Sequence, residues 1–253
     1  MAVPSVLAIG ASHLNAIAAG YERLHAEQDL PLGLTALQLN LPKYNPLIIR
    51  KPSCFDVNNA LKEDIDRALE TSDPVYIVYS LGGNVHNVVG LVQHPVPFDV
   101  FLPGEVRRRR ISPHTKVVPY AMMEAMFAHR NGGFKIALEV LRGYLKRPSV
   151  QILPPPPIAS EEHIRRRPGP FKEALEQGKI APVALRQRLW RTYCNFLRSI
   201  SEPLDIKCLE PPADAIDQTG CLATAYYGAD PTHANTEYGK LVFRQILEEC
   251  GVA

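Results

Sequence analysis

The sequence predicts a three-layer α/β fold, in which a sheet of about five parallel strands lies between two layers of helices. Short apolar runs rich in β-branched residues alternate with longer segments whose apolar residues recur at helical spacing. Strands separated by helices form right-handed βαβ units, which build a parallel sheet covered on both faces. A length of 253 residues, 46% hydrophobic and 21% charged, suits one globular domain, expected to span residues 1–253.

The chain is expected to open with a strand, a tight turn and a helix. Ser5 to Ile9 is a short apolar run that ends at Gly10. From Ser12 onward the apolar residues have helical spacing. These positions are Leu14, Ile17, Ala18, Tyr21 and Leu24. The start of the helix therefore follows the carboxyl end of the first strand.

The second and third strands are expected over Leu34–Leu39 and Val75–Tyr79. The latter run is dense in β-branched and aromatic residues, which favour strands, and it leads into Gly82-Gly83-Asn84. A helix is predicted between the two strands, with Asp56 as its cap. Its apolar positions are Leu61, Ile65, Ala68 and Leu69.

The strand signal disappears between about residues 85 and 147. Two helices are expected there, over Tyr120–His129 and Phe134–Leu145, separated by Asn131-Gly132-Gly133. We interpret the segment as a helical elaboration of the crossover that follows the third strand.

The last third of the chain is predicted to complete the sheet. Ser149–Leu153 is the fourth strand, and Pro154–Pro157 ends it because prolines cannot continue a central ladder. The proline run is alternatively a polyproline ligand for another protein. A long helix is expected from Pro182 to about Ser199, a fifth strand over Leu204–Leu209, and a closing helix over Asn235–Glu249.

The composition excludes several classes of protein. Five scattered cysteines without a C-x-x-C pair indicate neither a disulfide framework nor a zinc ribbon. A formal net charge of +2 gives no global field that would attract nucleic acid or anionic lipid. The longest apolar runs are strand-sized, so no membrane span is expected, and the first residues do not resemble a secretory signal. We expect a cytoplasmic protein with no nucleic-acid partner.

Two arginine runs, Arg107–Arg110 and Arg165–Arg167, carry local positive charge. Such runs usually form solvated surfaces. The first run lies in the elaborated crossover, where the alternative is a role in attracting anionic substrates to a cleft.

Polar residues follow the predicted strands at the sheet edge where ligands of parallel α/β folds bind. Ser12 follows the first strand and either caps the helix or presents its hydroxyl at this edge. Asn84 follows the third strand, as a turn residue or as an amide donor. Asp230 precedes His233 by three positions, and it either caps the last helix or orients the imidazole.

Nucleophilic acyl transfer needs a hydroxyl, a base, a group that orients the base, and donors for the developing oxyanion. Ser12, His233, Asp230 and Asn84 can fill these four roles in that order. The combination, rather than any single residue, predicts an acyl-transfer site.

In their order along the chain, these residues resemble the SGNH hydrolases, also called GDSL esterases/lipases. Gly10-Ala11-Ser12-His13 stands where that family has G-D-S-L, and Gly82-Gly83-Asn84-Val85 where it has G-x-N-D. Asp230-Pro-Thr-His233 stands where it has D-x-x-H. The resemblance spans Ile9 to Leu247 and implies a flavodoxin-like α/β/α fold and ester hydrolysis.

The chain departs from the family at three places. Ala11 and Val85 replace the two aspartates, and no glycine follows the second strand, where the family has its second block. If Asn45 takes the place of that glycine, it supplies a backbone N–H from a left-handed conformation, which asparagine tolerates better than most residues.

The resemblance implies a serine esterase that forms an acyl-enzyme on Ser12, with His233 as base and Asp230 as its orienter. Asn84 and the backbone N–H groups of Ser12 and Asn45 are the expected oxyanion hole. The expected substrate is a small-molecule or carbohydrate ester, and the chemistry needs no metal and no cofactor. Two alternatives stay open: an acyltransferase acting on a carbohydrate or small alcohol, and a catalytically degenerate binding protein of the same fold.

Overall fold

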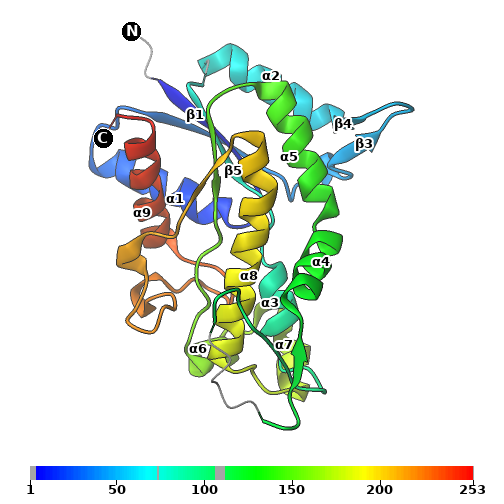
Figure 1. Ribbon diagram of the computed structural model, residues 1–253. Helices are drawn as coiled ribbons and strands as arrows, with labels where there is room; N and C mark the ends of the chain where they lie inside the picture. Colours follow the sequence, from blue (N-terminus) through cyan, green and yellow to red (C-terminus); the bar gives the residue numbers. More distant parts are fainter. Residues whose placement is uncertain (1–3, 73, 106–111, 253) are drawn as a thin grey trace.

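The computed structural model describes residues 4–72, 74–105 and 112–252. Its centre is a sheet of five parallel strands in the order β2-β1-β5-β8-β9 (Figure 1). The strands are β1 (Ser5–Gly10), β2 (Gly33–Gln38), β5 (Tyr76–Ser80), β8 (Ser149–Ile152) and β9 (Lys207–Leu209). Numbered along the chain within this sheet, the order is 2-1-3-4-5, which is the flavodoxin-like order. The predicted α/β fold class is confirmed.

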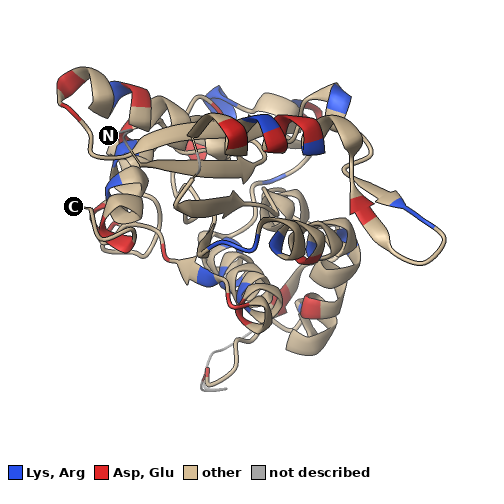
Figure 2. Cartoon of the chain, turned by 90° about the horizontal axis from the view of Figure 1, so that it is seen from above, with Lys and Arg blue, Asp and Glu red and all other residues tan. Residues whose placement is uncertain are grey.

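The strands are apolar because helices cover both faces of the sheet. In β1, Leu7 and Ile9 join the core on one face, and Val6 and Ala8 join the core on the other. Lys207 is the one charged residue in the described strands of this sheet, whereas Figure 2 shows acidic and basic residues spread over the surrounding helices. Charge is therefore kept on the outer layers.

Helices α1 (Leu14–Glu27) and α9 (Thr236–Glu249) cover one face and pack on each other (Figure 1). Their contact depends on glycine. A Cβ at Gly239 would lie 1.7 Å from the carbonyl oxygen of Ala16, and a Cβ at Gly20 would lie 2.3 Å from the carbonyl carbon of Gly239. Any side chain here would force apart the two helices whose first turns follow Ser12 and His233.

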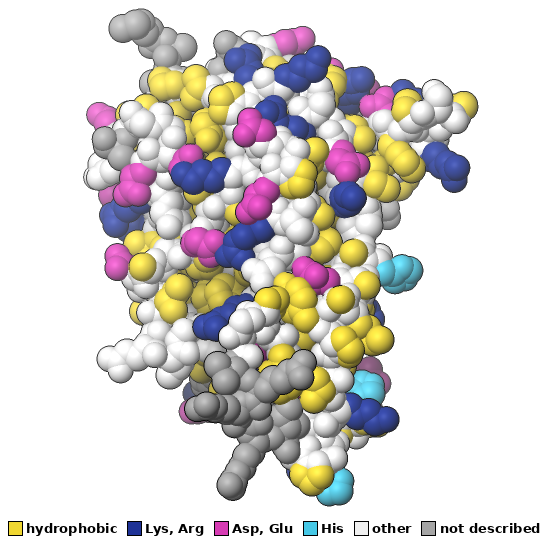
Figure 3. All heavy atoms as spheres, viewed as in Figure 1, with side chains coloured by type: hydrophobic (Ala, Val, Ile, Leu, Met, Phe, Trp, Pro, Cys, Tyr) yellow, Lys and Arg dark blue, Asp and Glu magenta, His cyan; other side chains and the backbone are white. Residues whose placement is uncertain are grey.

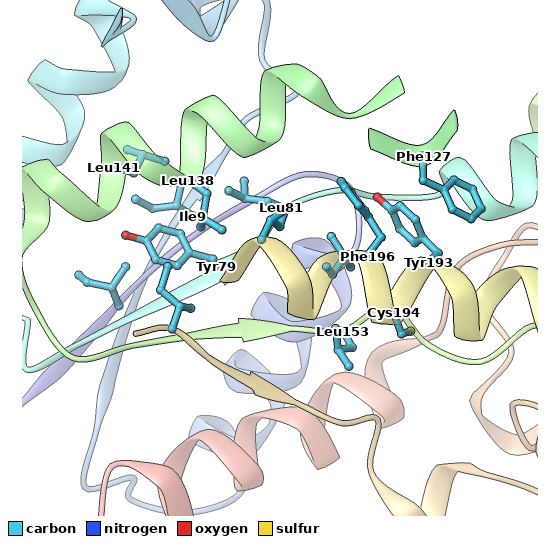
Figure 4. Close-up of a cluster of buried hydrophobic side chains, with 14 of the residues drawn as sticks. Ile9, Tyr79, Leu81, Phe127, Leu138, Leu141, Leu153, Tyr193, Cys194 and Phe196 are labelled. Carbon is cyan, nitrogen blue, oxygen red and sulfur yellow. The ribbon is translucent and has the colours of Figure 1, made fainter. Parts of the chain in front are cut away.

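Three helices build the core on the opposite face. They are α2 (Asn59–Ser72), α5 (Gly132–Leu145) and α8 (Val183–Ser201). Figure 4 shows Tyr79 of β5 beside Leu138 of α5, with Tyr193 of α8 in the same cluster; all three side chains are almost completely buried. This layer carries the bulk of the aromatic core.

The crossover from β5 to β8 contains more structure than the sequence predicts. The helices α4 (Tyr120–Arg130) and α5 confirm the two expected helices, and the short α3 (Val85–Gly90) precedes them. The strands β6 (Phe98–Val100) and β7 (Lys116–Val118) pair in parallel, although no strand is expected in this segment. At three residues each, they are too short to establish an alternating pattern.

A hairpin between β2 and α2 is also absent from the prediction. Its strands are β3 (Ile48–Arg50) and β4 (Phe55–Val57), and it projects from the body of the molecule (Figures 1 and 2). Asp56 lies inside β4, so its prediction as the cap of α2 is wrong. Asn58 caps the helix, because its Oδ1 accepts the N–H groups of Ala60 (2.9 Å) and Leu61 (3.3 Å).

The proline run forms a buried exit from β8. Pro154–Pro157 are all buried, and Trp190 donates its indole N–H to the carbonyl of Pro154 at 2.9 Å. The N–H of Leu222 reaches the carbonyl of Pro157 at 3.2 Å. Because it is covered, this run cannot present itself as a polyproline ligand.

The remaining helices are short. They are α6 (Glu161–Arg166), α7 (Lys172–Gln177), and the 3₁₀ turns η1 (Pro42–Tyr44), η2 (Gly169–Phe171), η3 (Glu202–Leu204), η4 (Ala213–Ala215) and η5 (Thr224–Tyr226). Arg165–Arg167 are exposed at the end of α6, and Arg107–Arg110 lie outside the described residues.

Acidic and basic side chains are interspersed on the face shown in Figure 3. Within the described part of the chain, no helix combines the length and the apolar character that a membrane span requires.

Candidate active site

The candidate site lies where β1 and β5 end, side by side. Gly10 is opposite Ser80 in the sheet, and the N–H of Ala11 donates to the carbonyl of Ser80 at 3.1 Å. A Cβ at Gly10 would lie 2.6 Å from the Cβ of Ser80, so glycine permits this approach. The chain leaves β1 toward β2 on one side and later returns through β5 on the other, which makes this edge a topological switch point.

Ser12 lies in the turn between β1 and α1. It does not cap α1, because the N-cap position is His13 and no side chain makes a capping bond there. Instead, its Oγ lies 2.7 Å from Nε2 of His233, which precedes α9. Ser12 is thereby paired with a base 221 positions away in the sequence.

His233 is held by Asp230. Its Nδ1 lies 2.7 Å from Oδ2 of the carboxylate, while Oδ1 accepts the backbone N–H groups of Thr232 (2.8 Å) and His233 (3.0 Å). Burial alone would raise the pKa of Asp230, but the hydrogen bonds from His233 and Thr232 outweigh it and hold this pKa far below its usual value. The ionised carboxylate keeps the proton on Nδ1, so Nε2 is free to accept the hydroxyl proton of Ser12.

Asn84 follows two glycines in left-handed conformations, Gly82 (φ 99°) and Gly83 (φ 57°). From this turn the Asn84 side chain reaches the loop before α9. Its Nδ2 lies 3.1 Å from Nε2 of His233 and 3.0 Å from Oγ1 of Thr232. The structure therefore brings together the four residues singled out in the sequence from the turns after two strands and the loop before α9.

A pocket of about 250 Å³ opens beside these residues. Ser12, Asp230 and His233 form part of its wall. The apolar side chains that line it come from α1, from the end of β8 and from α9 with the loop before it, and they include Ile17, Ile152, Leu153 and Tyr238. A largely apolar space thus adjoins the hydroxyl of Ser12 and the imidazole of His233.

A likeness to one solved structure, with a TM-score of 0.51, supports the fold. No family model matches the chain, and neither does any curated protein. A solved structure from Streptococcus pneumonia, described as a platelet activating factor, is similar with a TM-score of 0.51 at 12% identity, over 98% of this chain and 83% of its own. A GDSL-like lipase from Bacteroides thetaiotaomicron gives a TM-score of 0.45 at 10% identity, over 99% of this chain and 93% of its own. The periplasmic domain of a lipopolysaccharide acetyltransferase from Salmonella ser. Paratyphi A gives a TM-score of 0.47 at 12% identity, over 97% of this chain and 83% of its own.

The chain has a flavodoxin-like α/β/α fold, which is the fold that the sequence resemblance to the SGNH hydrolases implies. Its strand order, and the turns that carry Ser12 and Asn84, match what the sequence resemblance implies.

The second block of the SGNH pattern is not formed by Asn45. Asn45 has a φ of −102° rather than a left-handed conformation, and its N–H is already donated to the carbonyl of Pro42 at 3.1 Å. The turn after β2 is instead tied to β1 at Leu39, whose N–H donates to the carbonyl of Gly10 at 2.8 Å. The N–H of Ser12, also expected as an oxyanion donor, takes part in no backbone hydrogen bond of the described turn.

Two further histidines have buried ring nitrogens: His13, which is half-buried beside His233, and His86, which is buried. The ring of His13 lies 4.8 Å from that of His233, and burial, together with His233, lowers the pKa of His13 to about 3. Burial also lowers the pKa of His86 to about 3, and its ring stacks at 5.5 Å on Tyr193. Both rings are therefore neutral near pH 7. Among the described residues, no group of three or more His, Cys, Asp or Glu is placed to hold a metal.

Proposed function

We propose that the chain is an ester hydrolase that forms an acyl-enzyme on Ser12. The line of hydrogen bonds from Ser12 Oγ through His233 to Asp230, at 2.7 Å for each step, carries the proposal. These distances lie within the range at which a base can take the proton of a nucleophile and a carboxylate can orient that base.

The chemistry follows from the donors and acceptors. As Ser12 Oγ attacks the ester carbonyl carbon, Nε2 of His233 takes the hydroxyl proton, and Asp230 stabilises the imidazolium. The negative charge on the carbonyl oxygen is stabilised by Nδ2 of Asn84 and the N–H of Ser12. When the tetrahedral intermediate collapses, His233 returns its proton to the leaving alcohol. A water molecule then attacks the carbonyl carbon of the acyl-enzyme while His233 takes one of its protons. His233 returns this proton to Ser12 Oγ as the bond to the acyl group breaks, and the free acid leaves.

The pocket supports a short acyl group as the substrate's acid part. Its volume of about 250 Å³ lies below the usual range for a drug-sized ligand, and its walls beside Ser12 are apolar. We expect kcat/KM to be highest for esters of short-chain acids and to fall as the acyl chain lengthens.

Labelling with a serine-directed fluorophosphonate tests the nucleophile. Wild-type protein should be labelled at Ser12, and Ser12→Ala should lose both labelling and ester hydrolysis. Its free energy of unfolding should change by less than about 0.5 kcal/mol, because this side chain caps no helix. Labelling at another serine, or full activity in Ser12→Ala, contradicts the proposal.

Ser160→Ala is the matched control. Ser160 caps α6 by accepting the N–H of His163 at 3.1 Å, so its loss should cost about 0.5–2 kcal/mol of stability. Labelling and hydrolysis should persist in this variant. Assays with added alcohols separate hydrolysis from acyl transfer: transferred ester in place of free acid would identify an acyltransferase.

A further inference from the structure

The carboxamide of Asn84 is held from both ends. Its nitrogen faces Thr232 and His233, and its oxygen faces Nδ2 of Asn87 at 3.3 Å. Asn87 lies one turn further along α3 and is only 4% exposed, and Thr232 is 7% exposed. Both contacts are thus shielded from water, where the direction of each hydrogen bond matters most.

The Asp230 carboxylate fixes the direction of the hydrogen bonds around Asn84. The ionised carboxylate only accepts, so the hydroxyl of Thr232 donates to its Oδ1 at 2.9 Å and leaves the Thr232 oxygen as an acceptor toward Asn84. The carboxylate likewise keeps the proton of His233 on Nδ1, which leaves Nε2 as an acceptor. The Thr232 oxygen and Nε2 of His233, which carries the lone pair used by Ser12, therefore both face the same end of the Asn84 side chain. Its NH₂ group suits this place, because one N–H can donate to Thr232 and the other stays available to the substrate oxygen.

The oxygen of Asn84 must then point the other way, and it needs a donor there. Asn87 supplies that donor through its own NH₂ group. If the Asn84 carboxamide were turned over, its oxygen would face Nε2 of His233 and the developing oxyanion, both of which repel it. An oxyanion donor is useful only when its N–H is already aimed at the reacting oxygen.

We infer that Asn87 and Thr232 are positioning residues that fix the orientation of the Asn84 carboxamide, so that its N–H serves the oxyanion. The inference rests on the proposed function, because it assigns a role to the same site. Val85 stands where the SGNH pattern has an aspartate after the asparagine. Asn87, one helical turn after Asn84, supplies a hydrogen bond to the Asn84 side chain.

A double-mutant cycle tests the inference. Asn87→Leu removes the donor while keeping a similar side-chain volume, and Thr232→Val removes the acceptor with little change of shape. Each should lower kcat for a small ester by about 10-fold or more, with KM nearly unchanged, whereas Asn84→Ala should lower kcat by about 10² to 10³. In the Asn84→Ala background, Asn87→Leu should lower kcat no further, since no carboxamide is left to orient, whereas Thr232→Val still removes a hydrogen bond to Asp230 and keeps that part of its effect.

Asn87→Asp is a second, stronger variant, because a carboxylate would attract the NH₂ group of Asn84 and turn the carboxamide over. Asn58→Ala is the control: Asn58 is also buried and hydrogen-bonded, but it caps α2 away from the site, so its loss should lower stability and leave kcat unchanged. If Asn87→Asp does not fold, Asn87→Leu and Thr232→Val still decide the question.

A loss of kcat in Asn87→Leu that adds in full to that of Asn84→Ala, or wild-type kcat in both Asn87→Leu and Thr232→Val, would overturn the inference. Fluorophosphonate labelling of the wild type distinguishes a failure of the proposed function from a failure of the positioning role. Wild-type protein that is not labelled at Ser12 contradicts the proposed function. Labelled wild type with unaffected Asn87 and Thr232 variants contradicts only the positioning role.

Discussion

His13 and His86, next to the candidate site, make the stability of the folded protein depend on pH in acid. Burial lowers the pKa of each from 6.5 to about 3 in the folded state. Between these values the unfolded chain binds a proton on each imidazole, and the folded chain does not. The free energy of unfolding therefore falls as the pH drops from about 6.5 toward 3, by up to about 1.4 kcal/mol per pH unit for each histidine.

We predict that His86→Phe flattens this dependence. Phenylalanine can keep the packing on Tyr193 and binds no proton in the unfolded state. Urea unfolding between pH 7 and pH 4 should show a slope smaller by up to about 1.4 kcal/mol per pH unit than in the wild type. His129→Phe is the control, because His129 is exposed on α4 and loses little hydration on folding. A slope in His86→Phe equal to that of the wild type would contradict the assignment of His86 as a buried neutral group.

At the same scale, short motifs in the sequence were enough to select residues that the fold brings together. Ser12 and Asn84 end neighbouring strands, and the loop before α9 carries His233 to them. Asn87 and Thr232 could not be selected, because each is an ordinary polar residue whose importance depends on the direction of hydrogen bonds in three dimensions. Asn45 was a wrong choice because the local 3₁₀ turn uses its N–H.

At the scale of elements, the contact between α1 and α9 fixes the distance between nucleophile and base. Ser12 lies just before α1 and His233 just before α9, so a shift of either helix moves one reactive atom relative to the other. We predict that Gly239→Ala lowers the free energy of unfolding by about 1–3 kcal/mol, because the new Cβ would overlap the carbonyl of Ala16. Gly239→Ala should also lower kcat/KM under conditions in which the variant stays folded, because the shift of the helices separates Ser12 from His233.

Gly143→Ala in α5 is the matched control. Gly143 is exposed and a Cβ there meets nothing within 4 Å, so alanine should stabilise the helix by about 0.5–1 kcal/mol. Urea unfolding and ester kinetics on both variants check the pair. Equal stability of Gly239→Ala and the wild type would show that the two helices can separate without cost.

Elements with long, periodic patterns were predicted well, and short ones were not. The helices α1, α8 and α9 each span several turns with one apolar face, and the central strands are continuous apolar runs. The two small strand pairs consist of three-residue strands, and their pairing comes from the surrounding chain rather than from their own sequence. The cap of α2 was assigned to Asp56 because the unpredicted hairpin hides where the helix begins.

At the scale of the whole molecule, a buried ion pair joins the crossover segment to the main core. Nη2 of Arg188 on α8 lies 2.6 Å from Oδ1 of Asp99 on β6, and its Nε lies 2.8 Å from the same oxygen. Each side chain is only 9% exposed. The two residues are 89 positions apart in the sequence, so the pair holds the β6–β7 sheet against α8, which covers one face of the central sheet.

We predict that breaking this pair from one side destabilises the protein far more than removing it altogether. Arg188→Met removes the guanidinium that contacts Asp99 and leaves the charge of this buried carboxylate less compensated, so it should lower the free energy of unfolding by up to about 3–5 kcal/mol. In the double variant Arg188→Met with Asp99→Leu, both charges of the pair are gone, and most of that stability should return. Arg166→Met, which removes an exposed pair with Glu162 at 3.1 Å, should change stability by less than about 0.5 kcal/mol. Urea unfolding of the four proteins measures these differences. A double variant as unstable as Arg188→Met would contradict the prediction, because the instability would then come from losing the contact between the two side chains rather than from an unbalanced buried charge.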